Sequence, residues 1–524
     1  MDRSEQPMIS CAILERPGPW RAMSVATLLV IAVLPTVPLL WSAMASLASA
    51  PTLVGSGFAS AGQNSALVAV PVAIVSLAVG LPTGVVAALY EFPGRRIFLA
   101  LTTLPLLVPS FLWAIGWSAL AARLGPATVS FITGVAGCVL VFFGAAVGLV
   151  LLTAYVASAA VSRSQVAAAR LAGGEHAVLF YTVRYAFTPA LLAAGLAGVL
   201  TLSDPGPGQI LGLRTVAAEI LTSFSALYDF ALAGQQCVVL TLFVLLAAVP
   251  LAYGVAHRLA SELMAKQLQV MQRTRHRTIA VVALPSLTLL VLAGTIAPLL
   301  GLLLPLVEDA AWERAWGELI RTAGNTFLYA AGAGAIAATL GLLLALCVGR
   351  QERLRTLCIG MLLALFSLPP ALTALGLVQI TAATPAWTDT FLRSRLTVCV
   401  ALGLRFFPVA AVLGMRAWGT TSASWVQAAA VHGVPLLTYL WRVVLPLLLP
   451  AGTAAMLLVT LLATADISTV LLLHPPGARS LPLAIFTVMA NAPESLVASL
   501  CLVYVGTATV LLVAMWALAS GEKR

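Results

Sequence analysis

Apolar residues dominate this chain in long, uninterrupted runs. About 20 consecutive apolar residues allow one α-helix to cross the hydrocarbon core of a membrane. On that criterion the runs predict about twelve membrane-spanning helices. They lie near residues 22–45, 65–90, 97–120, 132–158, 187–203, 231–255, 280–306, 325–349, 357–380, 397–418, 447–465 and 494–518. The runs lack the ten-residue alternation of a membrane β-barrel, so we expect an all-α polytopic membrane protein.

Polar and backbone-breaking residues recur at half the length of the chain. Asn64 and Asn325 each open an apolar run, and Pro109 and Pro370 are separated by the same offset of 261 residues. A near-constant offset of this size indicates duplication and fusion of one membrane unit. We therefore expect two pseudo-symmetric halves of six helices each that meet face to face. The expected organisation is an N-terminal segment 1–21, a first half 22–255, a linker 256–279, a second half 280–518 and a tail 519–524.

Charged residues are scarce and unevenly placed. They make up 9% of the chain, against 61% hydrophobic residues, whereas a soluble domain carries about 25% charged residues. With the N-terminus inside, the internal segments hold 20 of the 28 basic residues. This asymmetry predicts that both termini and the linker are cytoplasmic. The net charge of +10 is then a topology signal with some attraction to anionic membrane lipid, and no nucleic-acid partner is expected.

The linker 256–279 keeps a helical apolar rhythm and ends in a basic cluster. We interpret it as a solvated segment along the membrane surface, with a regulatory or docking role as the alternative. The seven cysteines contain no CxxC pair, and we interpret them as buried apolar residues.

Several sequence signatures of chemistry are missing. The sequence has no GxxxxGK[ST] phosphate loop, no HExxH and no GxSxG motif. We therefore expect no catalytic residue, no cofactor and no metal site, and the chain is not expected to be an enzyme. Carboxylates are nearly absent from the predicted spans, although ion-coupled carriers usually need them there. The energy for transport would then come from a partner protein.

A motif occurs in the predicted internal loop after the tenth span. It consists of Gln427, Ala428 and Ala429, then Gly433, and then Pro446 at the start of the next span. An Ala-rich helix can be approached closely, glycine permits a sharp turn, and proline begins a new helix. Such a helix–turn–helix can enter a cleft on another protein, although a simple surface elbow is the alternative.

The loop after the fourth span carries a weaker copy of this motif. Ala168, Ala169 and Gly173 keep the spacing, but the first polar residue and the final proline are missing. Both loops resemble the EAA loop of ABC importer permeases, whose pattern is Glu-Ala-Ala, three residues, Gly, nine residues and Ile-x-Leu-Pro. Gln427 stands where that pattern has Glu.

A second resemblance extends over nearly the whole chain after the first helix. The segments 208–234, 404–418 and 465–489 are similar to permeases of the ferric iron, thiamine, phosphonate and polyamine group. Asp466 and Ser468 replace a Glu and a Pro of that pattern. The resemblance implies a fused permease in the bacterial inner membrane that serves ferric iron, or otherwise thiamine, phosphonate or polyamine. It also implies two copies of a cytoplasmic ATP-binding subunit and a periplasmic solute-binding protein as partners. An ion-coupled secondary carrier with internal repeats is the alternative.

Three charged residues are candidates for the pathway or its gate. Arg405 lies inside a predicted span. It either snorkels or pairs with a carbonyl at a helix interface, or it faces the pathway or a gate, where Pro408 would free a nearby carbonyl to accept from it. Asp204 and Asp466 lie at matched span ends. They act either as helix caps or as parts of a gate where the halves meet.

Overall fold

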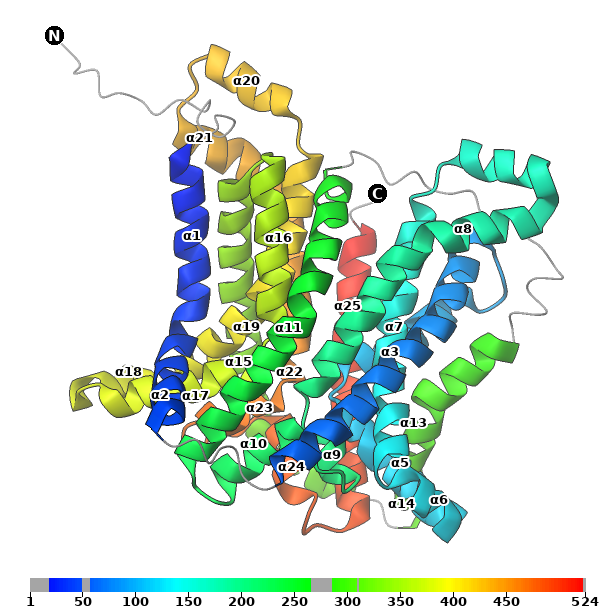
Figure 1. Cartoon of the computed structure of the whole chain (residues 1–524), viewed down its shortest axis with the longest axis vertical. Coiled ribbons are helices and arrows are strands. Elements are labelled where there is room, and N and C mark those ends of the chain that lie inside the picture. Colours follow the sequence, from blue (N-terminus) through cyan, green and yellow to red (C-terminus); the bar gives the residue numbers. More distant parts are fainter. Residues whose placement is uncertain (1–17, 50–56, 265–284, 309–310, 522–524) are drawn as a thin grey trace.

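The computed structural model describes residues 18–49, 57–264, 285–308 and 311–521 (Figure 1). In these ranges every regular element is a helix. The first half comprises α1 (Pro19–Val33), η2 (Leu34–Thr36), α2 (Val37–Ser49), α3 (Phe58–Leu89), α4 (Arg95–Leu107), α5 (Ser110–Leu124), α6 (Pro126–Ile132), α7 (Val135–Ala159), α8 (Arg163–Leu202), α9 (Gly206–Ile210), α10 (Val216–Ser225) and α11 (Phe230–Glu262). The second half comprises η3 (Leu292–Ile296), α13 (Ala297–Leu303), α14 (Pro305–Glu308), α15 (Trp312–Val348), α16 (Glu352–Ser367), α17 (Pro370–Ala383), η4 (Ala386–Thr388), α18 (Asp389–Leu392), α19 (Arg395–Thr420), α20 (Ala423–Val431), α21 (Leu436–Tyr439), η5 (Leu440–Val444), α22 (Leu445–Thr464), α23 (Ile467–Leu473), α24 (Leu481–Val488) and α25 (Glu494–Gly521).

The helices are long and apolar enough to span a membrane many times. The described residues hold ten such helices, or up to 12 if two bent pairs each count as one span. The chain is thus an all-α, multi-pass membrane protein, as its apolar runs predict. The bent pairs are α4–α5, with an angle of 106°, and α16–α17, with an angle of 81°. Each break falls at a proline, Pro109 and Pro369, because proline cannot donate the backbone hydrogen bond that would continue the helix.

The sequence repeat corresponds to a repeat of contacts. The Asn64 side chain donates to the carbonyl of Arg214 at 3.0 Å, and the Asn325 side chain donates to that of Arg479 at 3.3 Å. The next residue repeats the match, because the hydroxyls of Ser65 and Thr326 each accept from a backbone N–H that opens α10 or α24. The recurring polar residues therefore fasten α3 and α15 to the same place in each half. Asn325 lies thirteen residues after the start of α15, so this helix begins earlier than the predicted span 325–349.

The halves exchange their first helices. Arg21 in α1 is buried and donates to the carbonyl of Cys347 in α15. In return, the hydroxyl of Thr295 in η3 donates to the carbonyl of Leu101 in α4 at 2.8 Å. The backbone of Gly116 in α5 also approaches α13 so closely that no side chain would fit there. Small residues permit this kind of close helix packing in membranes.

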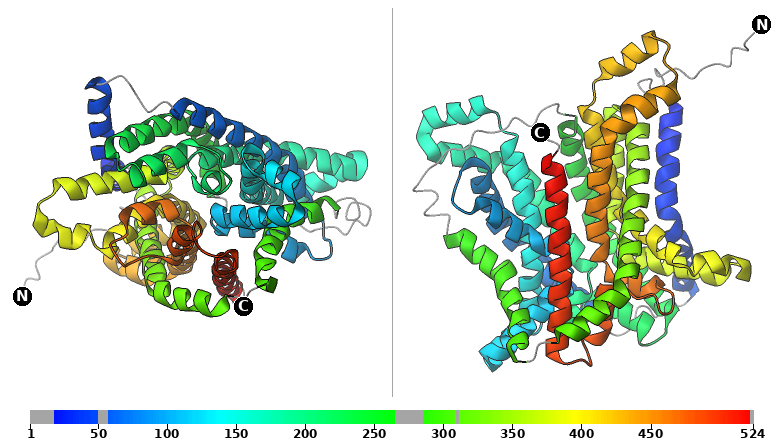
Figure 2. Two further views of the ribbon diagram at one scale, coloured as in Figure 1. Left: turned by 90° about the horizontal axis from the view of Figure 1, so that it is seen from below. Right: turned by 180° about the vertical axis from the view of Figure 1, so that it is seen from behind.

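The molecule has two distinct ends. The N-terminal part of α8 and the helix α20 project from one end, which we call the α20 end (Figure 1). The helices α6, α9, α10 and α24 lie at the opposite end, which we call the α24 end. The last helices of the two halves, α11 and α25, lie on opposite faces, as a pseudo-two-fold axis along the bundle requires (Figures 1 and 2).

The helix α11 extends into the predicted linker. The helix α11 continues to Glu262, and Arg416 in α19 donates to the carbonyl of Leu263 at 3.2 Å. The start of the predicted linker 256–279 is therefore helical and attached to the second half. Its remainder, residues 265–279, lies outside the described residues, as do residues 1–17 and 522–524.

Candidate functional site

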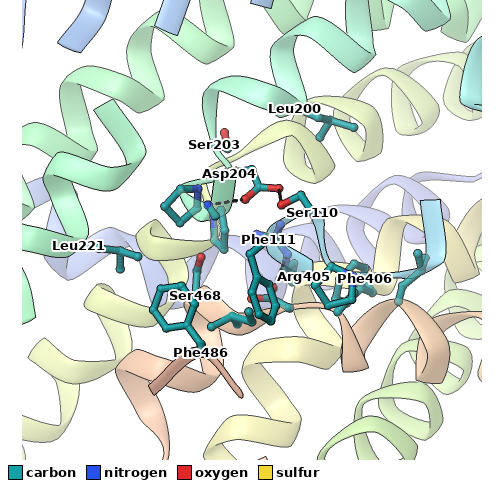
Figure 3. A pocket seen from close by; sticks show the side chains of 18 of the residues that line it. Ser110, Phe111, Leu200, Ser203, Asp204, Leu221, Arg405, Phe406, Ser468 and Phe486 are labelled. Atoms are coloured by element: carbon teal, nitrogen blue, oxygen red, sulfur yellow. Dashed lines mark hydrogen bonds and ion pairs between the residues drawn. The ribbon is translucent and has the colours of Figure 1, made fainter. Parts of the chain in front are cut away.

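A cavity of about 250 Å³ lies between the two halves, where their broken helices meet (Figure 3). The α4–α5 and α8–α9 breaks contribute residues of the first half. The α16–α17 and α22–α23 breaks contribute residues of the second half. The polar side chains that line the cavity are Ser110, Ser203, Asp204, Arg405, Asp466 and Ser468. The aromatic side chains are Phe111, Phe366, Phe406 and Phe486.

Asp204 lies between α8 and α9, on the first-half side of the cavity. The Ser110 hydroxyl donates to its Oδ2 at 2.6 Å, and the Gly206 backbone N–H donates to its Oδ1 at 2.9 Å. Ser110 follows Pro109 directly, so the helix break that forms the cavity also supplies the partner of this carboxylate. Each oxygen of the carboxylate accepts one hydrogen bond and can accept another.

Asp466 occupies the matched position in the second half and has different partners. Its side chain caps α23, accepting from the Thr469 N–H at 2.9 Å and from the Thr469 hydroxyl at 3.0 Å. Its Oδ2 lies 2.7 Å from Nε of Arg405. The alignment of these two atoms is too poor for a hydrogen bond, so the contact is an ion pair. Asp466 is therefore a helix cap that also lines the cavity between the halves.

Arg405 also faces the cavity. In the described part of the chain its partner is the Asp466 carboxylate, and neither a helix-interface carbonyl nor one freed by Pro408 accepts from it. The guanidinium lies 5.5 Å from the centre of the Phe406 ring. Among the described residues, its terminal nitrogens have no hydrogen-bond partner, and the side chain is 21% exposed. Arg405 can therefore donate to a solute in the cavity without losing its ion pair.

The two halves contribute unequally to this cavity. The residue 261 positions before Arg405 is Gly144, and the residue 261 positions after Ser110 is Ala371. The duplicated carboxylates thus have a neutral hydroxyl on one side and a guanidinium on the other. The cavity offers two carboxylates, one guanidinium and four aromatic rings, which suits a small polar or charged solute. No group of three or more His, Cys, Asp or Glu that could hold a metal ion occurs in the part of the chain that the structure describes.

The second predicted loop forms the separate helix α20. Gln427 and Ala428 are exposed, and Ala429 is half-buried. Gly433 has φ +64°, in the left-handed region that glycine adopts without strain, and it turns the chain after α20. Pro446 lies ten residues into the continuous helical span Leu436–Thr464, directly after the π-helical turn η5. The motif therefore predicts the helix and the turn, whereas the proline lies inside the next span and not at its start.

The first predicted loop is the N-terminal part of α8. Ser162 and Gln165 cap its start reciprocally. Ala168 is exposed and Ala169 half-buried, as in the second loop. Gly173, the expected counterpart of Gly433, has φ −164°, and its neighbour Gly174 takes the left-handed conformation with φ +66°. The turn is thus one residue later than the alignment of the loops predicts, because two adjacent glycines are available there.

Matched apolar side chains project from both loops. Leu171 is 91% exposed and Val431, which lies 260 residues later, is 84% exposed. Five residues earlier, Val166 and Val426 are both buried and hold their loop helices against the bundle. Each loop therefore presents a nearly fully exposed apolar side chain at a matched position. The sequence motif did not single out these two residues, although their spacing repeats.

The loops are attached to the bundle by different contacts. In the first half, Glu175 pairs with Arg170 and accepts from the Tyr90 hydroxyl at 2.6 Å. Burial and this carboxylate raise the pKa of the Tyr90 phenol above its ordinary value, so Tyr90 remains a donor. In the second half, Arg350 donates to the Thr421 carbonyl at 2.6 Å and to its hydroxyl at 2.7 Å. The first loop is therefore attached to the bundle at Glu175, just after its glycine turn. The second loop is attached at Thr421, just before the helix α20 begins.

The structure thus brings Asp204, Arg405 and Asp466 together and separates them from the two loops. It adds Ser110, Thr469 and the four phenylalanines to the residues that the sequence singles out. Of these, only Ser110 has a position in the sequence, directly after Pro109, that could have indicated its place in the cavity. Comparisons of the chain with protein-family models, curated proteins and solved structures find no match.

Proposed function

We propose that this chain is the membrane-spanning permease of an ATP-driven solute importer. The observation that carries the proposal is the pair of matched loop helices at the α20 end, each with a nearly fully exposed apolar side chain, Leu171 or Val431. Exposed apolar residues on short surface helices are typical of docking sites for another protein. Because the two loops repeat, they would accept two copies of one partner, and the resemblance to EAA loops favours an ATP-binding subunit.

Each loop is connected to the cavity by one helix. The helix α8 runs from the first loop to Leu202, two residues before Asp204. The helix α22 follows the second loop and ends at Thr464, two residues before Asp466. Movement of the loops by the ATP-binding subunits would therefore move the two carboxylates. Such rigid-body movement of the halves would open the cavity alternately to either end.

The proposed orientation places the α20 end in the cytoplasm of a bacterium and the protein in its inner membrane. Basic residues at the α20 end outnumber those at the α24 end, as expected for the cytoplasmic side. Those at the α20 end are Arg21, Arg95, Arg96, Arg163, Arg170, Arg184, Arg258, Arg350, Arg353, Arg355, Arg416 and Arg442. Those at the α24 end are Arg123, Arg214, Arg314, Arg321, Arg393, Arg395 and Arg479. A periplasmic solute-binding protein would then deliver solute at the α24 end.

The solute group that the resemblance suggests is ferric iron, or otherwise thiamine, phosphonate or polyamine. ATP hydrolysis would take place on the separate subunits, and this chain would supply the pathway. A binding assay on the periplasmic protein that works with this permease would identify the solute.

Site-specific photocrosslinking tests the docking proposal. A photoreactive amino acid at position 171 or 431 should crosslink, in intact cells, to a protein that mass spectrometry identifies as a P-loop ATPase. The same amino acid at Trp387, which is 81% exposed but lies outside both loops, is the control and should not capture it. Crosslinks to no ATPase from either loop would contradict the proposal.

An ion-coupled carrier remains the second candidate, favoured by the two carboxylates in the cavity. The two proposals differ in their energy source. Uptake by proteoliposomes that contain this chain alone, driven by a proton or sodium gradient, would decide for the carrier. Uptake that requires ATP and added ATPase subunits would decide for the importer.

A further inference from the structure

A polar crevice separates α8 from α11 near the α20 end. The two helices touch at Leu192 and Gly254, where an added Cβ on the glycine would lie 3.3 Å from the leucine. They touch again at Gly195 and Leu251. Closer to the α20 end they enclose a cavity of about 480 Å³. Its lining residues are Tyr181, Arg184, Tyr185, Thr188, Pro189, Arg258 and Ser261.

The crevice is basic and rich in hydroxyl groups. Arg184 projects from α8 and Arg258 from α11, and both are exposed. Neither arginine has an ion pair or a side-chain hydrogen bond among the described residues, and no carboxylate lines the cavity. Two guanidinium groups beside the hydroxyls of Tyr181 and Tyr185 form a donor set that suits a phosphate group.

Exposed apolar side chains continue from the crevice along α8, away from the α20 end. Phe187 is 45% exposed and Leu191 is 43% exposed. These residues lie three and seven positions after Arg184, on the same helix face. In a membrane-spanning helix, such side chains provide a surface for acyl chains next to the charged crevice.

The second half lacks this arrangement. Val444 and Leu445 lie 260 residues after Arg184 and Tyr185, and Leu449 lies 261 residues after Thr188. A structural role shared by the repeated helices would appear in both halves. The arginine and hydroxyl groups of the crevice are therefore a specialisation of the first half.

We propose that the α8–α11 crevice binds the phosphate group of one anionic phospholipid. Arg184 and Arg258 contact the phosphate from two helices, and the acyl chains lie along the apolar residues of α8. The lipid is favoured over free phosphate because the apolar surface begins within one turn of Arg184. This inference depends on the membrane-spanning fold and is independent of the proposed importer function.

Native mass spectrometry of the full chain, released from bilayers of phosphatidylcholine mixed with phosphatidylglycerol, tests this site. The unmodified chain should retain phosphatidylglycerol in preference to phosphatidylcholine. R184Q and R258Q should each weaken that retention about five-fold, because a basic residue near the membrane surface contributes about that factor. R353Q removes an exposed arginine at the same end, outside the crevice, and should retain the lipid like the unmodified chain.

Two further measurements test whether the change in lipid retention is specific to this crevice. R184K preserves the charge but not the planar guanidinium group with its paired donors. Its retention of phosphatidylglycerol should therefore lie between that of the unmodified chain and that of R184Q. Thermal unfolding of every variant shows whether it remains folded. Equal retention by the unmodified chain, R184Q and R258Q, or equal retention of phosphatidylcholine, would overturn the proposal. Displacement of the lipid by added inorganic phosphate would also overturn it, in favour of a site for the free anion.

Discussion

Arg405 and Asp466 form an ion pair inside the cavity between the two halves, with Nε 2.7 Å from Oδ2. The carboxylate side chain is only 3% exposed, and its polar contacts are this guanidinium and Thr469. The pair belongs to the second half alone, because the first half has Gly144 at the position that matches Arg405. A duplicated scaffold has thus acquired one polar centre that is not duplicated.

Replacing Arg405 by Met should destabilise the protein and reduce solute uptake. The substitution leaves a buried carboxylate without its partner, which costs on the order of 3 kcal/mol. The double variant R405M/D466N removes both charges and should recover most of the lost melting temperature while uptake stays low. Thermal unfolding in detergent and uptake by proteoliposomes measure the two effects separately. Uptake near that of the unmodified protein in the double variant would show that the ion pair has only a structural role.

The turn after each loop helix should tolerate substitutions according to its backbone conformation. Gly433 and Gly174 have positive φ values of +64° and +66°, so G433V and G174V should lower the stimulation of the ATPase. Valine is strained in that region because of its branched Cβ, whereas asparagine adopts it more readily. G433N is therefore the matched control and should retain most of the stimulation, since no atom lies within 4 Å of the added Cβ. Equal losses of ATPase stimulation in G433V and G433N would mean that contact with the partner, rather than backbone strain, causes the loss.

The exposed apolar residues of the loops should matter for assembly and not for folding. L171K and V431K introduce a charge at side chains that are 91% and 84% exposed, so the melting temperature should change little. Each variant should lose co-purification of the ATP-binding subunit, because a lysine in an apolar contact must be desolvated. Because the motif is better kept around Gln427, we expect the larger loss for V431K. Unchanged co-purification in both variants would remove the loops from the interface.

The features that the sequence predicted correctly depend on local backbone chemistry. Pro109 and the adjacent Pro369 and Pro370 mark the two broken helices, and Asn64 and Asn325 mark equivalent contacts of α3 and α15, because each acts through its own backbone or a fixed neighbour. The ion pair of Arg405 needs the distance between α19 and α23, which no local pattern contains. The exchange of α1 and α13 between the halves was missed for the same reason. The sequence of an apolar helix face does not indicate which helix it packs against.

The shift of the left-handed turn from Gly173 to Gly174 has a different cause. Spacing within the motif placed the turn at Gly173, and both glycines are capable of it. The Glu175 side chain, held by Arg170 and Tyr90, fixes the chain just after the pair. Tertiary contacts thus select between two residues that the sequence leaves equivalent.

Cysteine labelling should establish the orientation of the bundle in the membrane. In a variant that lacks the seven native cysteines, a cysteine at position 171 lies at the α20 end, and one at position 479 lies at the α24 end. Both side chains are exposed in the structure, whereas the neighbouring Ser480 is buried and would report poorly on either orientation. The basic residues at the α20 end predict that it faces the cytoplasm. A membrane-impermeant maleimide applied to intact spheroplasts should therefore label position 479 and leave position 171 unlabelled until the membrane is permeabilised. Labelling of position 171 without permeabilisation would reverse the orientation and place the proposed docking loops on the wrong side for an ATP-binding partner.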